Sequence, residues 1–173
     1  MGLLRNRGDE AAVGSRYRMR QRLLSIGDDY WIEHDDGSRA FRVDGKALRI
    51  RKTLVLEDTT GREVAKLQER KLSVRDKMEI ERDGRSIATV SKALVGIRDR
   101  FSIDVEGGAD LSAKGNLVDH EYEIERDGDT VATVSKRWFA VPDTYGVAIA
   151  PDEDDALVLA ITVCIDTLSH PRD

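Results

Sequence analysis

The stretch DDALVLAITVCIDTL, residues 154–168, decides the fold of this 173-residue chain. In the ten residues that follow its two aspartates, only Thr162 is polar. Acidic residues at the start favour the positive end of a helix, and Pro171 beyond the end is a stop signal. The pattern therefore predicts a hydrophobic helix over about residues 153–168.

The rest of the chain must enclose such a helix. At about 100° per residue its apolar side chains point in almost every direction, and only Asp155, Thr162 and Asp166 form a narrow polar stripe. A helix that is apolar all round belongs in a core or a membrane, and this one is shorter than the ~20 residues that span a bilayer. Because an unpaired buried carboxylate is costly, we expect Asp166 at the mouth of the fold or beside an arginine.

The composition indicates a soluble protein with a single core. Charged residues make up 35% of the chain and aromatic residues 5%, and 173 residues suffice for one domain. The net charge of −5 argues against nucleic-acid binding, which depends on neutralising phosphates. The one cysteine, Cys164, excludes an intramolecular disulfide and a CxxC metal site, and its place in the apolar run predicts a small buried hydrophobe.

Residues 1–15, MGLLRNRGDEAAVGS, indicate a flexible leader before a single domain over residues 16–173. They contain no apolar segment of the kind found in secretory signals. Asn6 stands where a myristoylation motif needs Ser or Thr. We therefore expect a cytoplasmic protein without a transmembrane segment, with peripheral association at the membrane as a further alternative.

Residues 15–150 show short strand-like segments separated by turn signals about every ten residues, the rhythm of an all-β sandwich or barrel. The pattern predicts roughly twelve strands. Four hairpins are expected, over residues 30–43 about Asp35-Asp36-Gly37, over 53–71 about Thr59-Thr60-Gly61, and over 78–92 and 122–136. The other strands are expected over residues 16–24, 100–105, 110–115 and 143–150.

The two predicted hairpins are near copies of each other. MEIERDGRSIATVSK, residues 78–92, and YEIERDGDTVATVSK, residues 122–136, are identical at eleven of fifteen positions. Asp-Gly at each centre favours a two-residue type I′ turn. In the first copy Ile80 would then lie opposite Ile87, with Glu79 on the face toward water, and the second copy would be equivalent.

Simple geometry selects a barrel for these strands. Twelve strands ~4.8 Å apart and tilted ~45° close into a barrel of about 13 Å radius, which holds a helix ~10–12 Å across and a layer of inward side chains. Eight strands would leave a radius of about 9 Å and no room, and a sandwich would leave one side of the helix bare. The expected fold is mainly β, a closed and mostly antiparallel barrel around a central C-terminal helix.

A series of ordered motifs resembles the LURP-one-related family. They are LSIGDDY (24–30), FRVDGK (41–46), HEYEI (120–124), WF (138–139), DTYG (143–146) and the acidic residues before the helix. The resemblance runs from about Tyr17 to Leu168 and implies the fold of the tubby C-terminal domain, twelve strands around a hydrophobic helix. Plant relatives are linked to defence, and tubby proteins use the fold to bind phosphoinositides, although their headgroup-binding residues are not aligned with this sequence.

Catalytic motifs are absent: the sequence contains no GxSxG, no phosphate-binding loop and no GxGxxG. Three histidines, His34, His120 and His170, are far apart in the chain. We interpret them as separate, hydrogen-bonded side chains, with convergence in space as the alternative. Acidic pairs such as Asp35 and Asp36 are interpreted as caps and solvated loops. We therefore expect a protein that is not an enzyme and holds no cofactor and no metal.

Arginine recurs at every second position at the start of the expected domain. On a strand this spacing places the guanidinium groups on one face, with Tyr17 and Met19 on the other. One interpretation is a solvated outer face with acidic partners on neighbouring strands. The other is a docking stripe for phosphate-bearing lipids or polyanions. The candidate residues are Arg16, Arg18, Arg20, Arg22, Arg49 and Arg51.

Two functions from different classes follow from these observations. The first is a non-enzymatic binding or scaffold module that docks on anionic, phosphoinositide-like membrane lipid through the arginines. The second is an intracellular protein-interaction or stress- and defence-related component without affinity for lipid. The expected partners are accordingly anionic lipid headgroups or a protein, and not a nucleic acid.

Overall fold

A computed structural model describes residues 13–20, 29–46, 52–70, 76–93 and 100–170 of the chain. Most of the expected leader lies outside the described residues. In the part that is described, no helix is both long enough and apolar enough to cross a membrane.

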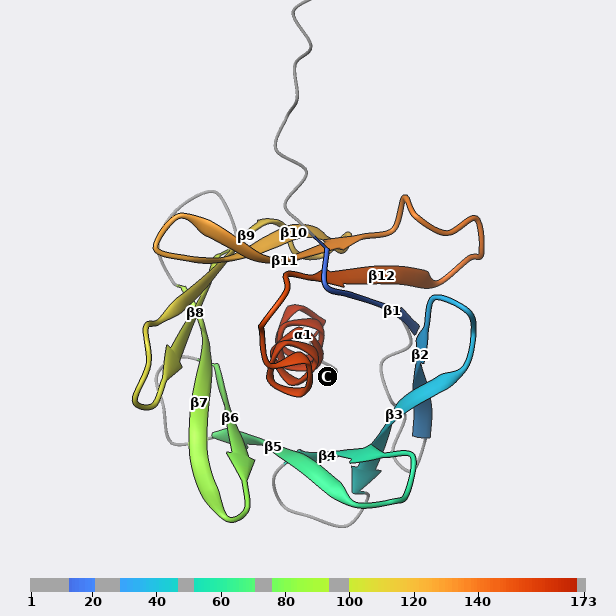
Figure 1. The fold of residues 1–173 in the computed structure, drawn as a ribbon. Coiled ribbons are helices and arrows are strands. Elements are labelled where there is room, and N and C mark those ends of the chain that lie inside the picture. The colour runs from blue at the N-terminus through green and yellow to red at the C-terminus, as the bar shows by residue number, and fades with distance from the viewer. Residues whose placement is uncertain (1–12, 21–28, 47–51, 71–75, 94–99, 171–173) are drawn as a thin grey trace, which may run out of the picture.

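The described strands close into a twelve-stranded barrel, as predicted (Figure 1). Each strand lies within a few residues of its predicted position. They are β1 (Ser15–Arg20), β2 (Asp29–His34), β3 (Arg39–Lys46), β4 (Thr53–Asp58), β5 (Glu63–Arg70), β6 (Lys77–Arg82), β7 (Arg85–Lys92), β8 (Arg100–Val105), β9 (Leu111–Asn116), β10 (Glu121–Arg126), β11 (Asp129–Ser135) and β12 (Thr144–Ile149).

The order of strands in the barrel follows their order in the sequence, and neighbouring strands are antiparallel. β1 closes the barrel because it pairs with β2 on one side and with β12 on the other. Its pairing with β12 runs from Ser15 opposite Ile149 to Arg20 opposite Thr144. Closure removes the free edges that an open sheet would present.

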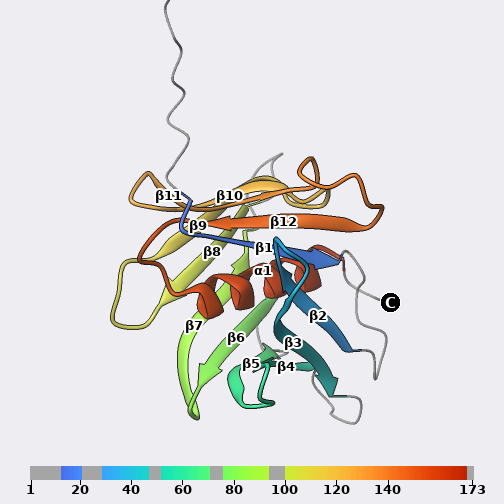
Figure 2. The same ribbon diagram turned by 45° about the vertical axis from the view of Figure 1, so that its right-hand side comes forward.

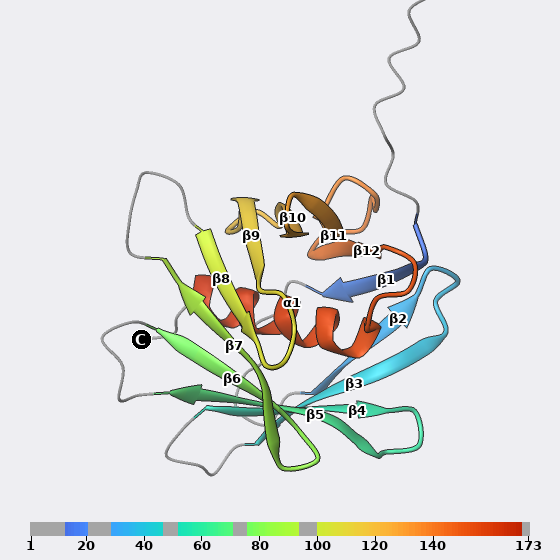
Figure 3. The same ribbon diagram turned by 60° about the vertical axis from the view of Figure 1, so that its left-hand side comes forward.

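The predicted helix, α1 (Asp155–Ser169), runs through the lumen of the barrel (Figures 1, 2 and 3). Figure 1 looks along α1 with strands on every side, and the turned views show its length inside the barrel. Every residue from 158 to 166 is buried, which is what its apolar surface requires. Burial raises the pKa of the Cys164 thiol above its usual range, so this residue is the buried hydrophobe that was predicted.

The repeated hairpins form the predicted turns but not the predicted register. Asp83 and Gly84 both have positive φ, as a type I′ turn requires, and so do the equivalent residues of the second copy. A β-bulge follows the turn, so Ile80 lies opposite Ala88 and the predicted pairing with Ile87 is wrong by one residue. Glu79 is also buried rather than facing water, with Arg70 of β5 paired to its carboxylate, whereas its counterpart Glu123 in the second copy is exposed as predicted.

The barrel has two different ends. Because successive strands are antiparallel, the turns that follow the even-numbered strands all lie at one end, which we call the hairpin end. The odd-numbered strands finish at the other end, which we call the loop end. α1 follows β12, so it begins at the hairpin end and finishes at the loop end.

At the hairpin end, the two repeat copies hold the start of α1. Arg82 donates hydrogen bonds of 2.7 and 3.1 Å to Asp154, and its counterpart Arg126 donates bonds of 2.8 and 3.0 Å to Glu153. Asp154 is also the N-cap, since its side chain accepts from the Leu157 backbone N–H at 3.1 Å. The acidic residues before the helix therefore act as caps and ion-pair partners.

Candidate functional site

The predicted arginine face is present on β1. Arg16 and Arg20 are exposed and Arg18 is half-buried on the outside of the barrel, whereas Tyr17 and Met19 between them are buried. This alternation is the one expected for a strand with one side in the core. The remaining predicted residues, Arg22, Arg49 and Arg51, lie outside the described residues.

Two of these arginines stack on aromatic rings from the β11–β12 connection. The Arg16 guanidinium lies 5.6 Å from the centroid of the Trp138 ring, and that of Arg18 lies 4.8 Å from the centroid of Phe139. Gly146 of β12, which pairs with Arg18, provides the space, because a Cβ there would lie 2.5 Å from Cε3 of Trp138. The rings therefore rest on the backbone of β12, beside the arginines.

Hydrogen bonds fix the start of this connection. Glu121 of β10 accepts from the Ser135 hydroxyl at 2.9 Å and from the Lys136 backbone N–H at 3.0 Å. The Arg137 guanidinium lies 3.9 Å from the same carboxylate, but 86% of its side chain is exposed. This arrangement holds Trp138 and Phe139 in place and leaves the charge of Arg137 in solvent.

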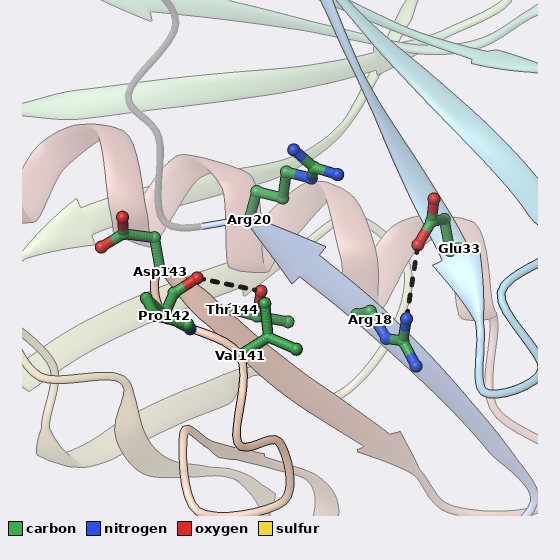
Figure 4. A pocket seen from close by; sticks show the side chains of 7 residues that line it. All are labelled: Arg18, Arg20, Glu33, Val141, Pro142, Asp143 and Thr144. Atoms are coloured by element: carbon green, nitrogen blue, oxygen red, sulfur yellow. Dashed lines mark hydrogen bonds and ion pairs between the residues drawn. The ribbon is translucent and has the colours of Figure 1, made fainter.

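A pocket of about 320 Å³ lies between β1 and the end of the connection (Figure 4). On one side Arg18 lies 3.8 Å from a carboxylate oxygen of Glu33. On the other side the Thr144 hydroxyl donates to the Pro142 carbonyl at 3.4 Å. The lining residues are Arg18, Arg20, Glu33, Val141, Pro142, Asp143 and Thr144.

The surface around this pocket combines apolar area with charges of both signs, since Glu33 and Asp143 line the pocket together with Arg18 and Arg20. Trp138 is 39% exposed and Val141 is 58% exposed, and they lie beside Arg16 and Arg20 respectively. Neither of these two arginines forms an ion pair with another described residue. We call Arg16, Arg20, Arg137, Trp138 and Val141 the arginine–aromatic patch.

A second group of polar residues lies inside the barrel, at the loop end of α1. His120 Nε2 is 2.7 Å from Asp166 Oδ1, and both side chains are almost fully buried. The same oxygen is 3.3 Å from Nδ1 of His170, and the two imidazole rings are nearly parallel with centroids 5.7 Å apart. The interpretation of separate histidines is therefore wrong for this pair, and only His34 stands apart on β2.

Asp166 lies near the barrel mouth, as one of the two alternatives predicted, but its partner is a histidine and not an arginine. His120 closes the short β9–β10 connection with a positive φ of 53°, which few residues other than glycine adopt. Its side chain faces the lumen, since it is almost fully buried and contacts Asp166 of α1. The connection thus places an imidazole at the last turn of α1.

Three tyrosines lie around this group, Tyr145, Tyr122 and Tyr30, since the charge of Asp166 adds to burial in raising the pKa of each. The Tyr145 ring stacks on His120 with centroids 4.1 Å apart. Burial, and then the nearby charge of Asp166, raise the pKa of both Tyr145 and Tyr122 far above the usual range. Their hydroxyls therefore remain protonated donors. We call His120, Tyr122, Tyr145, Asp166 and His170 the His–Asp cluster.

Chemically, the His–Asp cluster can orient a proton. A carboxylate on Nε2 leaves Nδ1 as the free nitrogen of His120, which is how an oriented general base is built. A reaction would also need a nucleophile and space for a substrate beside that nitrogen, whereas the pocket at Arg18 lies on the outside of the barrel. Among the described residues, no group of three His, Cys, Asp or Glu side chains could hold a metal ion.

The sequence predicts the arginines of β1 but not the residues that complete either site. Trp138 and Phe139 enter only through the family resemblance, although a Trp-Phe pair in a chain with 5% aromatic residues is itself a signal. Gly146 of β12 is a second signal of this aromatic contact, because a glycine within a strand often marks a close approach of another group. The pairing of His120 with Asp166 depends on barrel closure, and no local pattern indicates it.

Comparisons with known proteins support the architecture. The sequence model of the LURP-one-related family matches residues 15–166. An X-ray structure of a protein from Arabidopsis thaliana superimposes with a TM-score of 0.67 at 18% identity, and the alignment covers 92% of this chain and 94% of that one. At this identity the likeness shows a shared fold. No curated protein matches the sequence.

Proposed function

We propose that this chain, which belongs to the LURP-one-related family, is a non-enzymatic binding module for anionic membrane surfaces. Membership of the family by itself assigns no activity, so the proposal rests on the geometry. The arginine–aromatic patch is the docking surface in this proposal. One observation carries it: Trp138 and Val141 are exposed directly beside Arg16 and Arg20, which have no ion-pair partner among the described residues.

Each part of the patch suits the boundary between water and lipid. A tryptophan ring is amphipathic and favours the headgroup level of a bilayer. Arginine presents a planar fork that can bind phosphate through two hydrogen bonds. The stacking of Arg16 on Trp138 holds the cation next to the apolar ring, so both would meet the membrane together. Val141 adds apolar area on the far side of Arg20.

Charge supports an oriented approach to the membrane. The whole chain has a net charge of −5, so an anionic surface repels most of the molecule. Attraction must then come from a local cluster of positive charge, and it acts over about 8 Å at physiological ionic strength. In this proposal the protein is a peripheral protein of the cytoplasmic face, bound through β1 and the β11–β12 connection.

The filled lumen supports a binding role over catalysis. In open barrels of this type a ligand or substrate occupies the interior. Here α1 occupies it, and residues 158–166 pack against the surrounding strands. The functional surface proposed is therefore on the outside of the barrel.

Vesicle sedimentation tests the proposal. We expect binding to vesicles of phosphatidylserine and phosphatidylcholine at low salt, and no binding to phosphatidylcholine alone. Each basic residue near an anionic surface contributes about 1 kcal/mol, so the double change Arg16→Gln and Arg20→Gln should weaken binding by about thirtyfold. Trp138→Ala should weaken it further, and salt should weaken binding of the wild-type protein.

The chain contains a matched control. Arg39 stacks on Trp31 at 4.5 Å on the strands β3 and β2, so the same chemistry occurs outside the patch. The changes Arg39→Gln and Trp31→Ala should leave vesicle binding unchanged. Equal losses from the control and the patch would show that general charge, and not this surface, binds the vesicles. If the wild-type protein does not bind anionic vesicles at low salt, the docking proposal is wrong, and the same patch would instead be a candidate surface for a protein partner.

A further inference from the structure

Unpartnered polar atoms gather at the loop end of the lumen. Each of them is fully buried, and none has a hydrogen-bond partner. They come from the β9–β10 connection, from β10, from β12 and from the last turn of α1, and so surround the position of Asp166. These atoms are His120 Nδ1, Tyr122 Oη, Tyr145 Oη and Ser169 Oγ.

Such atoms are rare in native proteins, because a buried polar group without a partner keeps the full penalty of leaving water. A single one can be tolerated as an isolated defect. Four from separate elements in one region are better explained by a polar molecule that they share. The rest of the lumen is lined with apolar side chains, so this region is distinct in character.

The hydrogen-bonding needs of the cluster define the molecule. His120 Nε2 faces the Asp166 carboxylate, so in the neutral imidazole Nε2 carries the proton and Nδ1 is an acceptor. Tyr145 cannot donate to that nitrogen, because its ring stacks on the face of the imidazole while the lone pair lies in the ring plane. The tyrosine hydroxyls are protonated donors, and neither has an acceptor within hydrogen-bond geometry, although Thr162 of α1 is a polar neighbour of the Tyr122 hydroxyl.

Only a molecule that both donates and accepts meets these needs. A metal cation could bind the lone pair of Nδ1 but could not accept from a hydroxyl, and a fully ionised anion has no proton to donate to the neutral imidazole. We propose that the loop end of the lumen binds ordered water, which donates to Nδ1 of His120 and accepts from the hydroxyls of Tyr122 and Tyr145. Buried waters typically make about three hydrogen bonds, which matches this set of partners.

This water site is independent of the proposed docking function. It would link β10, β12 and the β9–β10 connection through one shared hydrogen-bond network to the end of α1. The water would therefore be a structural component of the barrel, in the same sense as the ion pairs at the hairpin end. Loss of this water should lower the stability of the fold and leave vesicle binding unchanged.

A crystal structure at about 1.5 Å resolution tests the site directly. We expect at least one ordered water within hydrogen-bond distance of His120 Nδ1 and of a tyrosine hydroxyl. In solution the same water should give cross-peaks to the side chains of the cluster in NMR experiments that detect long-lived bound water. A side chain or backbone group found in its place, or a dry cluster with the four atoms still unpaired, would overturn the proposal.

Removing single hydroxyls provides a second test that keeps the packing intact. If water bonds the hydroxyls, Tyr145→Phe and Tyr122→Phe should each lower the Tm by about 2–4 °C, because a bonded group is lost. Tyr17→Phe is the matched control, since its hydroxyl donates directly to Asp155 at 2.6 Å. A Tm that stays the same or rises in both lumen variants, while the control falls, would show dry hydroxyls and refute the water site.

Discussion

The two ends of α1 are held by opposite means. At the hairpin end, the guanidinium groups of Arg82 and Arg126 bind carboxylates at the surface, where solvent reaches both partners. At the loop end, Asp166 meets His120 inside the barrel, where both side chains are almost fully buried. These contacts join side chains, and their character differs: partly exposed guanidinium–carboxylate pairs at one end and a buried imidazole–carboxylate pair at the other.

The comparison also explains the sequence repeat. Each copy of IERDG contributes one arginine to the start of the helix, Arg82 from the first copy and Arg126 from the second. Because the copies form the β6–β7 and β10–β11 hairpins, the two arginines approach the acidic residues before α1 from different parts of the barrel. The repeat thus supplies two equivalent clamps. Exposed ion pairs of this kind contribute little each, whereas breaking a buried polar pair is costly.

Removing α1 altogether has the largest expected effect, because the contacts at both of its ends and its buried surface are lost together. A chain that stops before Asp152 would lose about ten buried side chains worth ~1.5–3 kcal/mol each, which exceeds the stability of most domains. We expect an insoluble or unfolded product, as judged by circular dichroism and size-exclusion chromatography. A folded, monomeric truncated chain would contradict the role of α1 as the core.

Breaking the loop end should have the next largest effect. Asp166→Ala leaves the buried imidazole of His120 without its partner and should lower the free energy of unfolding by about 3 kcal/mol in chemical denaturation. Asp166→Asn keeps an acceptor oxygen at the same place and should cost clearly less. If the two variants lose the same amount, the hydrogen bond to His120 is not what stabilises this end.

The sequence predicts the architecture because its signals are local and agree with one another. Residues 156–165 are apolar on every side, so α1 must be enclosed by the rest of the chain. The regularly spaced turns divide that chain into enough strands to enclose it. The alternation of arginines with Tyr17 and Met19 is likewise a local pattern, and it places β1 correctly. Where a pattern of a few residues has one physical solution, the prediction holds.

Features that depend on distant segments escape this reasoning. The bulge in each repeated hairpin shifts the register by one residue, and both copies repeat the error because the turn sequence is the same. His120 and His170 are 50 residues apart, and only closure of the barrel around α1 brings them to one carboxylate. The stacking of Arg16 on Trp138 similarly depends on the path of the β11–β12 connection.

Breaking the hairpin end one clamp at a time should have a small effect. Arg82→Gln and Arg126→Gln should each lower the free energy of unfolding by less than about 1 kcal/mol, because both pairs are partly exposed to solvent. The loss should shrink in high salt. Arg85→Gln, an exposed change in the same hairpin, is the control and should be neutral. A loss from either clamp as large as that of Asp166→Ala would remove the contrast between the two ends.

The smallest expected effect is a pH dependence confined to the hairpin end. Partial burial acts to raise the pKa of Asp154, but the hydrogen bonds from Arg82 and from the Leu157 N–H, with the charge of Arg82, outweigh it and hold that pKa below its usual range. A carboxyl whose pKa is lower in the folded state stabilises the fold above its unfolded pKa, and this contribution is lost as the pH falls through the folded value.

Asp154→Asn isolates this contribution, because asparagine also caps helices but carries no charge. The wild-type protein should exceed the variant in free energy of unfolding by a few tenths of a kcal/mol at pH 7, since Asp154 and Arg82 are both partly exposed to solvent. The difference should begin to shrink as the pH falls below about 4, the usual pKa of an aspartate, and should vanish once the pH is below the lowered folded pKa of Asp154, because the wild-type carboxyl is then neutral as well. Subtracting the variant cancels the other carboxyl groups of the chain. A difference that grows in acid would mean that the start of α1 is not held by the ionised form of Asp154.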